Sequence, residues 1–439
     1  MKKLIICFIV IYSFVIFAID TEIENKVSTI TPVKNIIVLL ADGLSLNNKT
    51  IARIFKAGPY GSLNIDKIDN TGYMTNHSAD FWVSDSAANS TALSTGFKTD
   101  NGKVSVLPNG KVKSNLFERM GVIDRKTAIV TDGRISSEAL APFYSHADSS
   151  EDINNIIDFL FKRNIDIIMC GGERVFIPQA EGGVRTDQKN YIEEAQRLGY
   201  RFINSKDGLR NFSFSEKMLG VFAEENLPYE IDRKDSNISL SEMVKKSLDM
   251  LAESKNGFFL LIENSNLYRT LDDFDVKSSV EEIAQIDRIT GMVEEFIKKD
   301  ENTLFLILSG FDCGGLYVTA DFNPIVFDTL KVSILDMTSK INSAGTNAEE
   351  IVAVYSGVNL SKSEYNLVQS SMNTKHFRRT VSNVLCKRAG INTLSPEMYN
   401  RRTSTVTPVW AMGKHSEFFR GFHDNTDIGS IILKLSGIN

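Results

Sequence analysis

The segment Ser84-Asp85-Ser86-Ala87-Ala88 contains a serine whose setting could make it a nucleophile. Small helix-forming residues follow the Asp-Ser pair, so we predict that a helix begins here, with Asp85 or Ser84 as its cap. Ser86 would then lie at the helix N-terminus, where free N–H groups and the helix dipole favour an anion. A hydroxyl in that position can attack a phosphoester and carry the phosphoryl group afterwards. The alternative is an Ala-rich packing helix with an ordinary cap, which these residues alone favour.

Continuous apolar runs predict the strands that would position this helix. A run that is apolar on both faces is typical of a central strand in a sheet covered by helices on both sides. Six runs have this form: 35–40, 127–131, 166–170, 258–262, 304–308 and 409–413. Helical periodicity lies between them, over 241–253 and 278–299. We therefore predict an α/β fold with a large, mostly parallel sheet flanked by helices on both faces.

Two carboxylates directly follow predicted strands. Asp42 comes after the run 35–40, and Glu263 comes after the run 258–262. Because ligands of parallel α/β sheets bind at the carboxyl ends of the strands, we expect both carboxylates to lie at one edge of the sheet with Ser86. Each carboxylate taken alone could equally cap a helix or belong to a turn. Together they offer hard oxygen donors, which suit Mg²⁺ or Ca²⁺.

Composition and charge limit the partners and the location of the protein. The chain has 439 residues, 42% of them hydrophobic, and a net charge of −6 without any run of Lys or Arg, which argues against nucleic acid. Lys2 and Lys3, the apolar run after them and Ala18 have the order of a secretory signal peptide, so we predict a signal at 1–18 and a secreted or periplasmic mature chain. The run is short for a membrane span, and we expect no stable span after cleavage. An uncleaved N-terminal anchor is the alternative.

The mature chain, residues 19–439, is expected to form one domain. Residues 316–400 lack strong strand patterns and are rich in Ser, Asn and Thr, so we predict that they form an insertion or a lid over the site. Three cysteines remain in the mature chain: Cys170, Cys313 and Cys386. An odd number excludes a full disulfide framework and favours buried reduced thiols, with one bridge and a free thiol as the alternative.

The serine segment resembles the nucleophile segment of the alkaline phosphatases. The resemblance implies an alkaline-phosphatase-like fold, a phosphomonoester substrate, a phosphoserine intermediate at Ser86 with Asp85 beside it, and often a homodimer. It also implies two zinc ions, which generate the serine alkoxide and hold the leaving oxygen, and one magnesium ion, with Asp42 and Glu263 among the metal ligands. Further motifs of the family occur in order along the mature chain: Ala41-Asp42-Gly43, Thr95-Gly96-Phe97-Lys98-Thr99, 165–176, 257–263, Gly314-Gly315 and 419–428.

Several positions depart from the family pattern. The resemblance implies a phosphate-binding arginine where this chain has Ser150, and a magnesium-binding Thr or Ser where it has Ala139. Phenyl and glycine side chains supply no metal ligand, so the residues argue against zinc and leave magnesium as the plausible ion. Five zinc-ligand positions implied by the resemblance hold other residues. In chain order, the family's Asp, His, Asp, His and His correspond to Tyr268, Asp272, Gly310, Phe311 and Arg402.

These departures leave three functions open. The first is a secreted pseudophosphatase, weakly active or inactive, that binds a phosphate ligand or a partner protein. The second is an active phosphatase that uses Ser86 with Mg²⁺ on Asp42 and Glu263, and the third is a purely structural partner protein. Arg402 could contact phosphate or be a solvated surface charge. Asp272 and Asp312 could be substitute ligands or surface turn residues.

Overall fold

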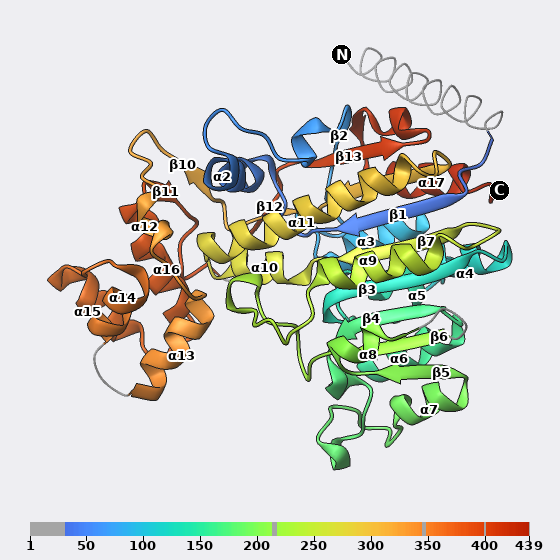
Figure 1. Ribbon diagram of the computed structural model, residues 1–439, viewed down its shortest axis with the longest axis horizontal. Helices are drawn as coiled ribbons and strands as arrows, with labels where there is room; N and C mark the ends of the chain where they lie inside the picture. The colour runs from blue at the N-terminus through green and yellow to red at the C-terminus, as the bar shows by residue number, and fades with distance from the viewer. Residues whose placement is uncertain (1–30, 213–216, 345–347, 399–400, 439) are drawn as a thin grey trace, which may run out of the picture.

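The computed structural model describes residues 31–212, 217–344, 348–398 and 401–438, and its centre is a ten-stranded sheet (Figure 1). The signal peptide predicted for 1–18 lies outside these residues. From one edge to the other, the strands are β14 (Gly421–His423), β2 (Asn70–Met74), β13 (Thr407–Gly413), β8 (Thr303–Leu308), β1 (Asn35–Leu40), β7 (Phe258–Glu263), β3 (Lys126–Arg134), β4 (Ile167–Gly171), β6 (Lys217–Val221) and β5 (Tyr200–Ile203).

The sheet is mostly parallel, as the sequence predicted. The central strand β1 pairs in parallel with β7 and β8, and the pairing stays parallel outward through β3, β4, β6 and β5. Only β13 runs against its neighbours, since it is antiparallel to both β8 and β2. All six predicted apolar runs are strands of this sheet, and both predicted helices, α9 and α11, are present.

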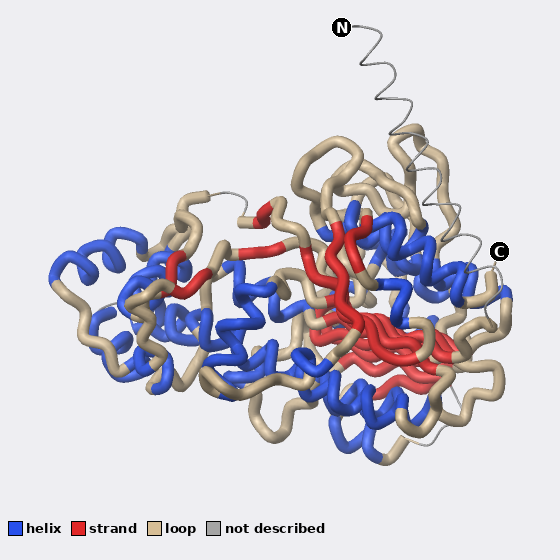
Figure 2. The backbone as a smooth tube through the Cα atoms, turned by 90° about the horizontal axis from the view of Figure 1, so that it is seen from above, coloured by secondary structure: helices blue, strands red, loops and turns tan. Residues whose placement is uncertain are grey.

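Helices cover both faces of the sheet, and Figure 2 shows the strands as a layer between them. On β1, Ile37 and Leu39 pack in one apolar cluster with α2, α9, α10 and α11, while Ile36 and Val38 pack in a second cluster with α3 to α6 and α17. This alternation explains why the run 35–40 is apolar throughout. The helices of these two layers are α2 (Leu46–Ala57), α3 (Ser86–Thr95), α4 (Leu116–Val122), α5 (Ala141–Tyr144), α6 (Ile153–Lys162), α7 (Tyr191–Arg197), α8 (Lys206–Arg210), α9 (Leu240–Leu251), α10 (Ser265–Asp272), α11 (Val276–Ile297) and α17 (Asn425–Leu435).

Residues 316–344 and 348–398 form a helical region beside the main sheet, at the left of Figure 1. Short strands β10 (Tyr317–Val318) and β11 (Ile391–Asn392) pair at its base, outside the ten-stranded sheet. A capping box begins helix α15 (Lys362–Ser371), in which the Ser361 side chain accepts from the backbone of Glu364 and the Glu364 side chain accepts from the backbone of Ser361. A lid function for this region stays a prediction. Its helices are α12 (Ile325–Asp328), α13 (Ile334–Ala344), α14 (Ala348–Ser356), α15 (Lys362–Ser371) and α16 (Phe377–Arg388).

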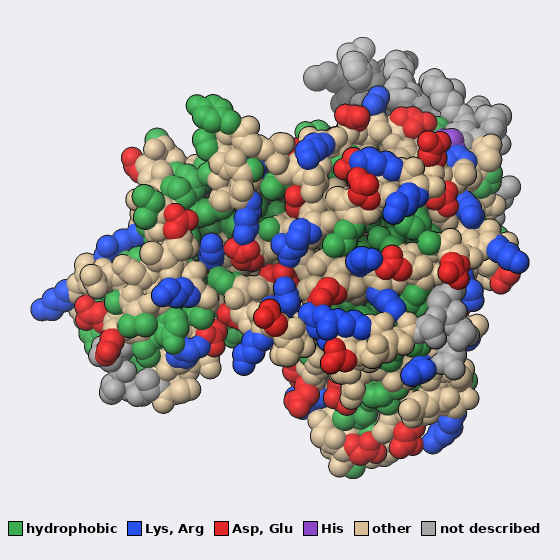
Figure 3. All heavy atoms as spheres, in the orientation of Figure 1, with side chains coloured by type: hydrophobic (Ala, Val, Ile, Leu, Met, Phe, Trp, Pro, Cys, Tyr) green, Lys and Arg blue, Asp and Glu red, His purple; other side chains and the backbone are tan. Residues whose placement is uncertain are grey.

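Three further properties of the described residues bear on the sequence predictions. Cys170, Cys313 and Cys386 are free and buried, as expected for reduced core thiols. No helix in the described part of the chain has the length and apolar character needed to cross a bilayer. On the face shown in Figure 3, acidic and basic side chains are intermixed.

Candidate active site

Ser86 is the first residue of α3, and Asp85 is its cap. Asp85 has an extended backbone, and its Oδ1 accepts a hydrogen bond from Ala88 N at 2.7 Å. Every residue of α3 is buried, which accounts for its Ala, Ser and Thr composition. The Ser86 hydroxyl is held from the other side, because Oγ donates to Asp42 Oδ2 at 2.7 Å.

Asp42 and Glu263 lie at the carboxyl ends of adjacent strands, as predicted. Glu263 ends β7 and is paired in register with Leu40, the last residue of β1, and Asp42 follows two residues later. The second oxygen of Asp42, Oδ1, accepts from Gly310 N at 2.8 Å. Burial raises the pKa of Asp42, although the hydrogen bond from Ser86 opposes this effect.

Glu263 is held by two hydroxyl groups from neighbouring segments. Its Oε2 accepts from Thr131 Oγ1 at 2.6 Å, and its Oε1 accepts from Ser137 Oγ at 2.8 Å. Burial raises its pKa to about 7, and the nearby charge of Asp42 acts in the same direction. The two carboxylates therefore share one low-dielectric environment.

Asp42, Ser86 and Glu263 line one cavity of about 220 Å³. Ser137, Glu138 and Arg269 contribute to its wall and were not singled out from the sequence, although Ser137 and Glu138 follow closely after the end of β3. The residues around the cavity are Leu40, Asp42, Ser86, Ser137, Glu138, Ala139, Glu263, Asn264, Ser265, Tyr268 and Arg269.

Three of the departing positions meet in one cluster near this cavity. The Arg402 guanidinium carbon lies 4.7 Å from the centre of the Phe311 ring and 5.5 Å from that of Tyr268. The two rings meet edge to face, with centroids 5.5 Å apart. Arg402 Nη2 also lies 3.5 Å from the Tyr268 hydroxyl and 3.8 Å from Glu138 Oε2. Its side chain is only 17% exposed, so Arg402 is an interior cation and not a solvated surface charge.

The other positions named from the sequence are engaged by protein groups. Asp272 is bonded by two arginines, with Arg401 Nε at 2.6 Å from Oδ1 and Arg379 Nη2 at 3.0 Å from Oδ2. Asp312 is buried, and its Oδ2 accepts from Thr403 Oγ1 at 3.0 Å.

Two more named positions lie around Glu138. Ser150 Oγ donates to Glu138 Oε1 at 3.3 Å. Ala139 contributes to the cavity wall but has no ligand atom.

The oxygen donors that could hold a metal are therefore Asp42, Glu263 and the hydroxyl of Ser137. Two carboxylates with water molecules are a common way to bind Mg²⁺. Among the residues that the structure describes, no group of three or more His, Cys, Asp and Glu side chains is arranged to hold a metal ion.

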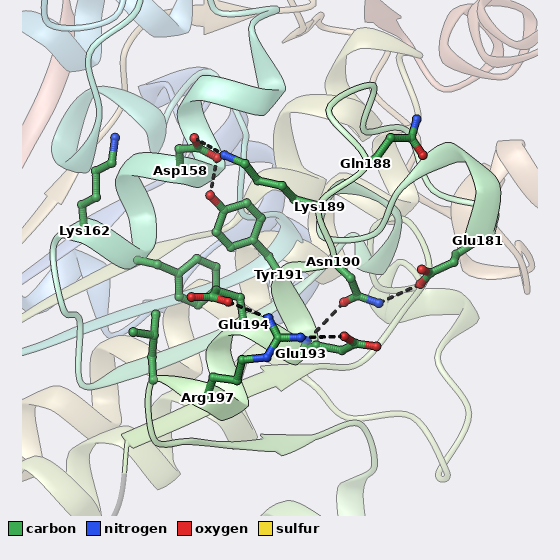
Figure 4. Close-up of a pocket in the computed structure, with 12 residues that line it drawn as sticks. Asp158, Lys162, Glu181, Gln188, Lys189, Asn190, Tyr191, Glu193, Glu194 and Arg197 are labelled. Atoms are coloured by element: carbon green, nitrogen blue, oxygen red, sulfur yellow. Dashed lines mark hydrogen bonds and ion pairs between the residues drawn. The ribbon is translucent and has the colours of Figure 1, made fainter.

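A larger cavity, of about 680 Å³, lies over α6 and α7 (Figure 4). Its charged groups pair mainly with one another: Lys189 Nζ lies 2.9 Å from Asp158 Oδ2, and Arg197 bonds both Glu193 and Glu194. Asp158, Lys189, Glu193, Glu194 and Arg197 are therefore engaged with one another. The smaller cavity at Ser86 is therefore the candidate active site.

The fold and this serine–carboxylate site define an alkaline-phosphatase-like protein, and comparison with known proteins agrees. The family model described as alkaline phosphatase matches residues 33–438, so the chain belongs to the alkaline phosphatase family.

Curated proteins are similar to the chain in sequence, and solved structures are similar to it in fold. The chain is 27% identical to alkaline phosphatase 4 of Bacillus subtilis (strain 168), over 92% of this chain and 88% of that protein, and 28% identical to alkaline phosphatase 3 of the same organism, over 94% and 90%. The crystal structure of Thermus thermophilus alkaline phosphatase is similar in fold, with a TM-score of 0.84, 20% identity, and coverage of 93% of this chain and 92% of that one. A cold-active alkaline phosphatase from Shewanella sp. gives a TM-score of 0.81 with 24% identity, over 92% and 99%.

Proposed function

We propose that this chain is a secreted or periplasmic pseudophosphatase of the alkaline phosphatase family, weakly active or inactive toward phosphomonoesters. It would act by binding a phosphorylated ligand or a partner protein. The observation that carries the proposal is the cluster of Tyr268, Phe311 and Arg402, in which a guanidinium group is stacked on two aromatic rings at family zinc-ligand positions. The order of residues 1–18 supports the location.

The donor set does not fit a pair of zinc ions. Zinc in proteins is bound by imidazole, thiolate or carboxylate groups, usually four ligands in tetrahedral geometry. Phe311 and Gly310 have no ligand atom, and Arg402 adds a positive charge. Asp272 is occupied by Arg379 and Arg401. Without the metal pair, the alkoxide and the leaving oxygen lose electrostatic stabilisation of several kcal/mol each, so rates would fall by many orders of magnitude.

The second candidate function is a magnesium-assisted phosphatase. It is favoured by one observation, namely that Asp42, Glu263 and Ser86 line the same cavity. Bound there, a magnesium ion would supply Lewis-acid stabilisation of charge on an oxygen atom. In that site Asp42 would orient the Ser86 hydroxyl through the bond at 2.7 Å, and Asp85 would hold the start of α3.

Hydrolysis of p-nitrophenyl phosphate separates the two candidates. The purified mature chain and its Ser86→Ala variant would be assayed from neutral to alkaline pH with zinc, with magnesium and with EDTA. The pseudophosphatase proposal predicts no turnover by the wild type above that of Ser86→Ala in any buffer, or a trace only. Robust turnover that needs magnesium and is absent in Ser86→Ala would establish the second candidate and overturn the first.

A further inference from the structure

Tyr268, Phe311 and Arg402, which stand at three of the predicted zinc-ligand positions, form one connected cluster of side chains. Tyr268 lies on α10, Phe311 follows β8, and Arg402 begins the short strand β12 (Arg402–Thr403), yet all three side chains are in contact. The backbone of Arg402 is held by antiparallel pairing with Cys313 of β9 (Asp312–Cys313). Aromatic faces attract guanidinium groups, so the two rings form a platform for this cation.

The backbone at Gly310 completes the network. A Cβ atom at this position would lie 2.8 Å from Asp42 Oδ1 and 2.8 Å from Asn89 Nδ2, which is too close. The absence of a side chain lets the amide of Gly310 reach Asp42 Oδ1 at 2.8 Å. Both oxygens of Asp42 therefore accept hydrogen bonds from the protein, one from Gly310 and one from Ser86.

Three carboxylates and one arginine, Arg269, line the cavity, and Arg402 is a second cation that lies beside one of these carboxylates, Glu138. Glu138 and Asp42 line the cavity together with Glu263. Arg402 Nη2 lies 3.8 Å from Glu138 Oε2, so its positive charge lies beside this group of carboxylates. One guanidinium group thus opposes the mutual repulsion of three carboxylates, a task that bound metal ions perform in metal sites.

We propose that Arg402, stacked on Phe311 and Tyr268, is a tethered countercharge that replaces the charge of the zinc pair. The site is then complete without a metal, and a divalent cation is excluded while Arg402 is in place. This inference rests on the proposed loss of zinc-dependent hydrolysis. It goes further, because it predicts that removal of one arginine creates a cation site from the remaining carboxylates.

Thermal unfolding with defined metals tests this inference. The unfolding midpoint of the wild type is expected to be the same in EDTA, in MgCl₂ and in ZnCl₂. Arg402→Gln is expected to unfold at a lower temperature in EDTA and to regain several degrees when MgCl₂ is added, because Mg²⁺ now neutralises the carboxylates. Arg402→Lys keeps the charge and should stay unresponsive to metal.

Arg420→Gln is the matched control, since it removes an exposed arginine and changes the net charge equally. It should behave as the wild type does. A wild-type midpoint that rises with zinc or magnesium would overturn the inference, and so would a folded Arg402→Gln variant that ignores both metals. If Arg402→Gln does not fold, the wild type and Arg402→Lys decide the question, because a metal response in either contradicts the countercharge.

Phosphatase activity measured on the same samples keeps this inference separate from the proposed function. Ser86-dependent hydrolysis by a wild type whose midpoint ignores metals would overturn the pseudophosphatase proposal and leave the countercharge standing. A wild type that is stabilised by zinc but has no activity would overturn the countercharge and leave the pseudophosphatase proposal standing.

Discussion

The two sides of the candidate site differ in the contacts that their side chains make. On one side, Asp85 and Ser86 keep the family motif at the start of α3. On the other side, Arg402 is a cation stacked on the aromatic rings of Tyr268 and Phe311. The first side is also a buried, capped helix, so packing alone is sufficient reason for its residues to persist. The Asp-Ser motif is therefore by itself weak evidence for catalysis, because a capped, buried helix accounts for both residues.

The largest expected effect is that of Gly310→Ala, on the side of Phe311 and Arg402. The new methyl group would overlap Asp42 Oδ1 and displace the bond from the Gly310 amide, so we expect a loss of about 3 kcal/mol in the free energy of unfolding. Chemical denaturation measures it. Gly121→Ala in α4 is the control, since a Cβ atom there meets nothing within 4 Å and should be neutral or stabilising. Equal behaviour of the two variants would contradict the close packing at Gly310.

Ser86→Ala tests the hydrogen bond between the start of α3 and Asp42. It removes the donor to Asp42 Oδ2 and leaves a buried carboxylate oxygen without that partner, at a cost of about 2 kcal/mol. The free energy of unfolding in urea is the measurement. An unchanged value would mean that the hydroxyl of Ser86 does not stabilise Asp42 in solution.

Asp85 variants test whether the preserved side has a purely structural reason to persist. Asp85→Ala removes the cap of α3 and should cost about 1 kcal/mol, whereas Asp85→Asn keeps an oxygen that can cap and should cost less. Circular dichroism during denaturation gives both values. If Asp85→Asn costs as much as Asp85→Ala, the second carboxylate oxygen, which accepts from Gly102 N, matters as much as the cap.

The smallest effect is expected at Asp424, near the preserved motif 95–99. Although burial alone would raise its pKa, hydrogen bonds from Thr75 and Thr426 and the charge of Lys98 hold the pKa below its usual value. The stabilisation from ionised Asp424 is therefore present above its ordinary pKa and is lost as the pH falls through the lowered value. Asp424→Asn should cost less than about 1 kcal/mol at neutral pH.

Unfolding curves of the wild type and Asp424→Asn recorded over a pH series test this sign. The difference between the two proteins should shrink in strongly acidic buffer. A difference that grows on acidification would contradict the assigned contacts.

Much of the fold could be predicted because its central strands are buried on both faces. The runs 35–40 and 304–308 are apolar at nearly every position, and such runs have few alternatives in a large α/β protein. The strands that were missed, β2, β14, β5 and β6, lie toward the two edges of the sheet. β14 has three residues and an exposed Phe422, so it carries too little pattern to be recognised.

The candidate site also has a part that could be predicted from the sequence and a part that could not. Asp42 and Glu263 could be placed together because each follows a strand, and strand ends meet at one edge. The stacking of Arg402 on Phe311 and Tyr268 could not be derived, because it depends on three segments far apart in the chain. For the same reason, the ion pairs of Asp272 with Arg379 and Arg401 could not be predicted.

Zinc content is the measurement that tests the central claim most directly. The mature chain would be incubated with excess zinc, freed of unbound metal by gel filtration, and analysed by inductively coupled plasma mass spectrometry. The proposed loss of the zinc pair predicts zinc far below one ion per chain. A value near two ions per chain would contradict this account, because it would mean that the cluster of Tyr268, Phe311 and Arg402 does not replace the zinc pair.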